Sequence, residues 1–151
     1  MEIWNQIWFF LAGLGVFNGL LLVGYCFLIL RSKQWRNVLF GLLMLMLCIR
    51  IGKSLFHIFT DVDRIYRQIG LSACVMIGPL LYLYIKTLLG KAESHPKSRL
   101  IHLGAPFISV VTVGVIWPYE TNPDLWNNYI VQGIYAVWSL YLIAGFVLVL
   151  P

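Results

Sequence analysis

The sequence of 151 residues has few charged side chains for its length. Asp, Glu, Lys and Arg make up 11% of it, less than half of the roughly 25% found in soluble domains. Hydrophobic residues make up 60%, and the mean hydropathy is +0.83. This composition excludes an ordinary soluble domain and is typical of an integral membrane protein, whose first partner is the lipid bilayer.

The residues that metal sites and catalytic sets require are also scarce. The three cysteines and three histidines stand singly, with no Cys-x-x-Cys pair and no second metal-type ligand at helical spacing. The sequence contains no Ser/His/Asp or Cys/His set, no phosphate-binding loop and no pair of intramembrane carboxylates. We therefore expect no disulfide framework, no metal, no cofactor and no enzymatic activity.

Five apolar runs are present, each of about the 20 residues that a helix needs to cross a bilayer. Lipid offers no partner to backbone polar groups, and the runs lack the alternation of barrel strands, so each run should be a helix. An acid and no basic residue precede the first run, which opposes a cleavable signal peptide. We predict one all-α transmembrane domain over residues 1–151, with helices at about 7–30, 38–59, 69–89, 100–117 and 129–150.

Basic and acidic residues gather at opposite ends of these runs. Seven of the eleven basic residues lie at one end, namely Arg31, Lys33, Arg36, Lys86, Lys91, Lys97 and Arg99. Five of the six acids lie at the other, namely Glu2, Asp61, Asp63, Glu120 and Asp124. Because cytoplasmic loops are enriched in Lys and Arg, we expect an outside N-terminus and a cytoplasmic C-terminus. The net charge of +5 then reflects membrane-flanking loops rather than a nucleic-acid surface.

Aromatic residues agree with this orientation. Trp and Tyr are enriched at membrane–water interfaces because their rings are apolar and their N–H or O–H groups are polar. We expect the outer interface to be marked by Trp4, Trp8, Trp117, Tyr119, Trp126 and Tyr129.

Three elements give the sequence a resemblance to a known family. They are "FNGLLL" (17–22) in the first run, a basic turn before a leucine-rich second run that contains Cys48-x-Arg50, and "GPLLYLY" (78–84) in the third. Over residues 15–50, 77–90 and 99–108 the chain resembles the membrane half of bacterial AraC-type transcription regulators. In that family an N-terminal module, typically of seven helices, is joined to a cytoplasmic helix-turn-helix domain.

The resemblance implies a multi-pass sensory or anchoring module in the bacterial inner membrane, which relays an outer-face signal to the helix-turn-helix domain. Residues 1–151 would hold five of about seven helices and no DNA-binding domain, so DNA would be bound only through a part beyond this segment. Pro151 directly follows an apolar run without a basic tail, and we expect a fragment of a longer product. Two other classes stay open: the membrane sensor of a histidine kinase, and a small non-enzymatic multi-pass protein or transporter subunit.

Two cations interrupt the second apolar run. In a helix, Arg50, Lys53, Ser54 and His57 fall on one arc about 100° wide. Arg50 would lie about 13 to 14 Å below Phe59 at the outer end, close to the midplane, whereas Lys53 would lie about 9 Å below it and reach the headgroups. No acid lies within the five runs. The partner of Arg50 is left open between an acid on a further helix, an outer-loop acid folded inward, a lipid phosphate and an anionic ligand.

The fifth run places polar and aromatic groups along one side, at Gln132, Tyr135, Trp138 and Tyr141. This side would line a pocket with the Arg50 arc if the two helices lie near each other. The cations of the arc are open to three interpretations: a structural role, by snorkelling and a polar contact between helices, a ligand or signal site, and a contact with a lipid headgroup. The candidate ligand-binding residues, for an anionic small molecule or lipid, are Arg50, Lys53, His57, Tyr135 and Trp138.

Small residues mark two candidate packing sites. Gly15, Asn18 and Gly19 form a small-x-x-x-small face with a polar side chain beside it, suited to packing within the chain or to a homodimer. Gly78 and Pro79 lie together in the third run. Proline removes a backbone donor from a helix, which predicts a kink at this position.

Overall fold

The computed structural model describes residues 3–29, 35–59, 64–91 and 96–150, and the regular elements within these ranges are all helical. The predicted all-α fold is therefore confirmed for this part of the chain. Two of the elements are single π-helical turns, labelled η. In chain order the elements are α1 (Ile3–Gly24), η1 (Tyr25–Ile29), α2 (Trp35–Phe59), α3 (Arg64–Leu88), α4 (Pro96–Ile116), α5 (Pro123–Leu125), η2 (Trp126–Ile130) and α6 (Val131–Val149).

Four helical stretches are long and apolar enough to cross a membrane, which agrees with four of the five predicted spans. They are Gln6–Leu28, Trp35–Phe56, Gln68–Leu88 and Pro123–Val149. The remaining helix, α4, forms as predicted. Its apolar stretch, Leu100–Ile116, is one residue shorter than the predicted run and covers about 25 Å of a core about 30 Å thick.

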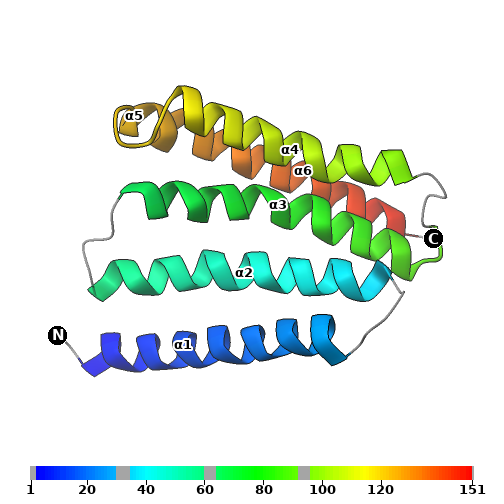
Figure 1. Ribbon diagram of the computed structural model, residues 1–151, viewed down its shortest axis with the longest axis horizontal. Coiled ribbons are helices and arrows are strands. Elements are labelled where there is room, and N and C mark those ends of the chain that lie inside the picture. The colour runs from blue at the N-terminus through cyan, green and yellow to red at the C-terminus, as the bar shows by residue number, and fades with distance from the viewer. Residues whose placement is uncertain (1–2, 30–34, 60–63, 92–95, 151) are drawn as a thin grey trace.

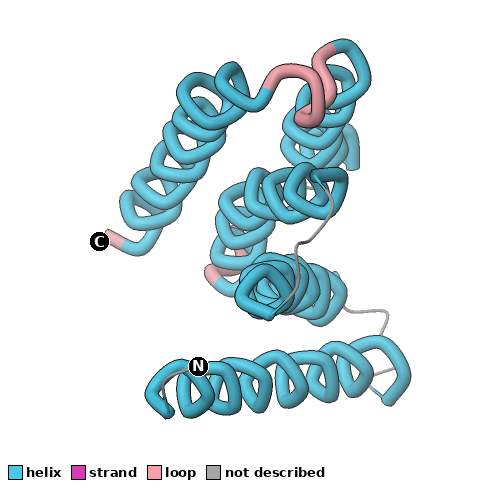
Figure 2. Tube along the Cα trace, turned by 90° about the vertical axis from the view of Figure 1, so that its left-hand side faces the viewer, coloured by secondary structure: helices cyan, strands magenta, loops and turns pink. Residues whose placement is uncertain are grey.

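The five long helices run in alternating directions, so that the described chain begins at one end of the bundle and finishes at the other (Figure 1). Helix α1 packs on α2, α2 packs on α3, and both α4 and α6 pack on α3. Figure 2 shows α1 at one edge of this arrangement and α4 and α6 diverging at the opposite edge. Helix α3 is therefore the element on which the rest of the bundle is organised.

Burial follows from this arrangement. In the most apolar window of α3, 56% of residues are buried, against 11% in α1. The buried residues of α3 are small or aliphatic, which lets neighbouring helices approach, and include Leu71, Ala73, Cys74, Val75, Ile77, Leu80 and Leu83. The exposed apolar faces of α1 and α6 are suited to lipid, because lipid rather than water surrounds a membrane helix.

Gly78 of α3 lies in close contact with α6. A Cβ atom built at Gly78 would lie 3.1 Å from Trp138 Cδ1 and from Tyr141 Cβ, and 3.2 Å from the backbone Cα of Trp138. Pro79 beside it is fully buried, and α3 continues through it as one helix that bends near its middle (Figure 1). The Gly-Pro pair thus lies at a helix–helix contact.

The glycine face predicted in α1 is divided by the structure. Gly19 is buried against α2, where Cys48 lies directly over it and the Cys48 thiol donates to the Val16 carbonyl at 3.8 Å. Gly15 and Asn18 are exposed, and a Cβ at Gly15 would meet nothing within 4 Å. Packing within the chain therefore uses only Gly19 of these three residues.

The connection between α4 and α6 is packed more tightly than its sequence predicted. Trp126 and Tyr119 were expected at the lipid interface, but Trp126 has 0% exposure and Tyr119 is buried. The Trp126 indole donates to the Trp117 carbonyl at 2.6 Å, and the Tyr119 backbone N–H donates to Gln68 Oε1 of α3 at 3.4 Å. These two aromatic residues hold the connection onto the start of α3.

Candidate functional site

Arg50 extends from α2 to α6 across the side of α3. Its Nη1 donates to Ser54 Oγ at 3.2 Å, and the Ser54 hydroxyl donates in turn to the Arg50 carbonyl at 3.3 Å. Its Nη2 donates to the Tyr135 hydroxyl of α6 at 3.5 Å. In the described chain α2 and α6 do not pack against each other, so this long side chain links two helices that α3 otherwise separates.

Within the described part of the chain, the groups that contact the Arg50 guanidinium are neutral. Besides the two hydroxyls, the thiol of Cys74, a buried residue of α3, lies within interaction range of the guanidinium. The five long helices contain no Asp or Glu in their sequences. A guanidinium carries five N–H donors and one positive charge, and these hydroxyls satisfy two donors without neutralising the charge. An anion would find both charge and donors here.

The depth of Arg50 along α2 follows from where the helix ends. Helix α2 continues to Phe59. Counted from Phe59, Arg50 lies about 13 to 14 Å inside the helix and Lys53 lies about 9 Å inside. Arg50 is therefore between the midplane and the outer end, which is a position that a ligand entering from that end would reach.

Tyr135 and Trp138 lie side by side on α6, with ring centroids 6.2 Å apart. Tyr135 is 40% exposed, so its hydroxyl is accessible as well as in contact with Arg50. The indole N–H of Trp138 is buried and has no acceptor among the described residues. Buried N–H groups are nearly always paired in folded proteins. The Trp138 N–H is therefore an available donor near Tyr135, in addition to the remaining donors of the Arg50 guanidinium.

The structure brings together part of the predicted site. Arg50 meets Tyr135, with Trp138 next to it. Lys53 instead lays its aliphatic stem along α3, where its Cδ would be 2.7 Å from a Cβ at Gly70. His57 lies in α2, and its side chain falls outside the described part of the structure.

Two neighbours of Arg50 and Tyr135 were not singled out from the sequence as site residues. Ser54 lies on the predicted arc, and its place four residues after Arg50 is the signal that would have identified it. Cys74 resembles any small buried residue in an apolar run, and only the packing of α2 on α3 places it near the guanidinium. Among the described residues no three of His, Cys, Asp or Glu gather closely enough to hold a metal ion.

No known family model, curated protein or solved structure matches the chain. The function must therefore be argued from the composition, from the bundle and from the contacts of Arg50. These define the class of the protein as a multi-pass helical membrane protein with a cation inside one of its spans.

Removing the Tyr135 hydroxyl should weaken the link between α2 and α6 while the ring stays packed on Trp138. We expect Tyr135→Phe to lower the free energy of unfolding by about 0.5–1.5 kcal/mol, the usual net value of one hydrogen bond. Equilibrium unfolding in mixed detergent micelles measures this. The matched control is Tyr129→Phe, since Tyr129 is 75% exposed in the preceding turn. Equal losses in the two variants would show that the Arg50–Tyr135 contact does not stabilise the bundle.

Proposed function

We propose that the chain is the membrane-embedded sensory or anchoring module of an AraC-like, membrane-bound transcription regulator of the bacterial inner membrane. It would form part of a module of about seven helices, with its N-terminus outside and its C-terminus in the cytoplasm. Support for the proposal comes from the sequence elements in the first three helices, the distribution of basic residues and the site around Arg50. DNA would be bound by a helix-turn-helix domain beyond residue 151.

The observation that carries the sensory role is the neutral environment of Arg50. Placing a cation in an apolar span costs about 2.5–3.5 kcal/mol at the helix centre, and hydroxyl partners return only part of this. An anionic ligand entering from the outer end would supply the missing countercharge. It would compete with Tyr135 for the guanidinium, and it would favour whichever arrangement of α2 and α6 leaves Arg50 most open to it.

Helix α6 offers a route from this site to the cytoplasmic end. It packs on α3 along its length and finishes at Val149, at the end of the bundle opposite the described N-terminus (Figure 1). At that end Lys91 Nζ donates to the Leu148 carbonyl at 3.4 Å, which ties the last turn of α6 to the end of α3. A shift of α6 at Tyr135 would therefore change the position of the segment that leads to the DNA-binding domain.

The proposed orientation and connection can be tested together. A fluorescent protein that folds only in the cytoplasm should fluoresce when it is fused after Pro151. A dark fusion, together with an active alkaline phosphatase fused at the same place, would overturn the orientation. The coding sequence should continue past Pro151 into a helix-turn-helix domain, and a histidine-kinase domain there would favour the rival sensor. Loss of the gene should change the transcripts of a defined set of genes, which a transporter subunit would not regulate directly.

A further inference from the structure

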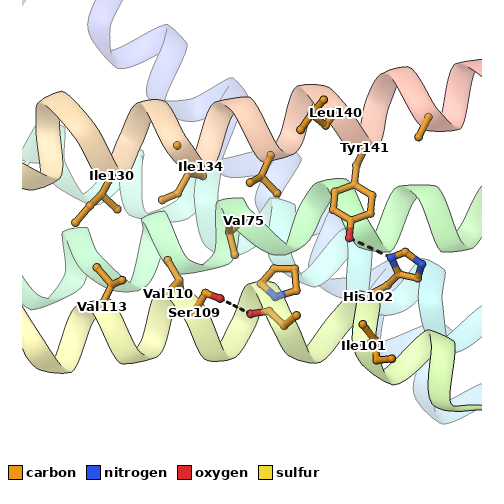
Figure 3. Close-up of a pocket in the computed structure, with 15 residues that line it drawn as sticks. Val75, Ile101, His102, Ser109, Val110, Val113, Ile130, Ile134, Leu140 and Tyr141 are labelled. Carbon is orange, nitrogen blue, oxygen red and sulfur yellow. Dashed lines mark hydrogen bonds between the residues drawn. The ribbon is translucent and has the colours of Figure 1, made fainter.

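A groove lies between α4 and α6. The two helices each pack on α3 but, within the described chain, not against each other, and they diverge from their connection (Figure 2). A cavity of about 880 Å³ lies between them (Figure 3). Val110 of α4 and Ile134 of α6 form its walls, and Val75 of α3 lies at its floor. This volume is within the range of about 300–1,000 Å³ that small-molecule sites occupy.

The lining of the groove is apolar along most of its length. Of the polar lining residues, Ser109 is satisfied within α4, because its hydroxyl donates to the Ala105 carbonyl at 2.7 Å. The other two, His102 and Tyr141, lie together at one end, with His102 Nδ1 and Tyr141 Oη 3.1 Å apart (Figure 3). The groove therefore has a hydrocarbon-like body and a single polar end.

Positive charge stands next to this polar end. The ring of Tyr82 lies 5.5 Å from that of His102 and 5.8 Å from that of Tyr141, centroid to centroid. Lys86 Nζ lies over the same Tyr82 ring, 5.7 Å from its centroid. The aromatic cluster thus connects the His102–Tyr141 pair to a lysine. An anionic group at this end would meet the two hydrogen-bonding groups and lie in the field of the positive charge beyond the Tyr82 ring.

The depth of the groove matches one leaflet of a bilayer. His102 is two residues inside the apolar stretch Leu100–Ile116, which places it about 3 Å from the interface. Val113, at the far end of the lining, lies eleven residues further, or about 16 Å deeper. Half of a core about 30 Å thick is about 15 Å. The polar end is thus at headgroup level, and the apolar body reaches about 19 Å from the interface, a few ångströms past the midplane.

We propose that this groove binds an anionic phospholipid, with one acyl chain between α4 and α6 and the phosphate at the His102–Tyr141 end near Lys86. The apolar walls alone would accept any hydrocarbon chain, whereas the polar and cationic end selects for a negative headgroup. Basic pockets between membrane helices bind acidic lipids for the same reason. The prediction that Tyr135 and Tyr141 share one side of this helix was wrong, because Tyr135 contacts Arg50 whereas Tyr141 contacts His102. Ile134 and Tyr141 lie about 100° or more around α6 from Tyr135, so this site is separate from that of Arg50.

The test measures which lipids stay bound to the full chain. The protein is reconstituted in vesicles of equal amounts of phosphatidylglycerol and phosphatidylcholine, extracted into detergent and washed, and the bound lipid is quantified by mass spectrometry. We expect phosphatidylglycerol to exceed phosphatidylcholine by about fivefold, the ratio that one nearby cation supplies at about 1 kcal/mol. Equal amounts of the two lipids would overturn the headgroup assignment.

Two variants separate the acyl groove from the polar end. Gly133 lines the groove, and a Cβ there meets nothing within 4 Å, so Gly133→Leu fills the groove without a clash. It should reduce the bound phosphatidylglycerol several-fold. Lys86→Met keeps the groove but removes the cation, and should instead lower the ratio of phosphatidylglycerol to phosphatidylcholine toward one.

The matched control is Gly104→Leu, the same change on α4 at a position that also meets nothing within 4 Å and does not line the groove. It should retain as much phosphatidylglycerol as the wild type. Three results would overturn the proposal: undiminished lipid in Gly133→Leu, equal loss in Gly104→Leu, or cross-linking of a second copy of the chain through cysteines placed in the groove.

Discussion

Arg50→Leu should abolish the proposed transcriptional response while leaving the protein in the membrane. The substitution removes the positive charge and both of its hydroxyl contacts, to Ser54 and Tyr135. Insertion should not suffer, because leucine is about 3–4 kcal/mol more favourable than arginine at the centre of a membrane helix. The amount of protein in the membrane fraction should thus equal that of the wild type. The transcript profile should match that of a strain that lacks the gene.

Two further substitutions at the same position show which property of Arg50 matters. Arg50→Lys keeps the charge but loses the planar fork, and we expect a partial response. Arg50→Gln keeps hydrogen-bonding capacity without the charge, and we expect no response, because the proposed ligand is an anion. A normal response in Arg50→Leu would contradict the sensory role entirely, and a normal response in Arg50→Gln would contradict recognition by charge.

Much of the fold could be predicted from hydropathy, because an apolar run of about 20 residues has few structures open to it other than a helix. The ends of the helices could not be predicted as well. Helix α3 begins at Arg64 rather than near residue 69, since a helix continues into polar residues wherever backbone hydrogen bonds are available. Helix α4 shows the same limit: it begins at Pro96, four residues before the predicted run, while its apolar stretch begins at Leu100 as predicted.

Contacts between helices were predictable only where each partner belonged to a polar arc visible in its own helix. Counting 100° per residue places Arg50 on a polar arc of the second run and Tyr135 on a polar and aromatic side of the fifth, and the structure joins the two residues. The His102–Tyr141 pair could not be found in this way, because its members are 39 residues apart and meet only through the packing of both helices on α3. Trp126 was misplaced for a related reason: its amphipathic ring suits a lipid interface, but a protein carbonyl satisfies its N–H instead.

Gly78→Leu should destabilise the bundle. At Gly19, Gly70 and Gly114 a new Cβ would meet only side-chain atoms, but at Gly78 it would also meet a backbone atom of the neighbouring helix. The new Cβ would stand 3.2 Å from the Trp138 Cα, which is a backbone atom, so the two helices must separate. Overpacking of this kind costs about 1–3 kcal/mol, and the separation would also draw Tyr135 away from Arg50. We expect a loss of about 2 kcal/mol in unfolding free energy, together with a weakened response.

Gly13→Leu is the control for this substitution. It makes the same change inside a membrane helix, with nothing within 4 Å of the new Cβ, and so includes the gain in helix propensity, about 1 kcal/mol, without the clash. It should be neutral or slightly stabilising in the same unfolding measurement. Equal unfolding free energies for the two variants would mean that α6 does not pack tightly on α3 at Gly78. In that case the proposed transmission from Arg50 would fail, because a shift of α6 at Tyr135 reaches the end of the helix only if α6 is held against α3 beyond that residue.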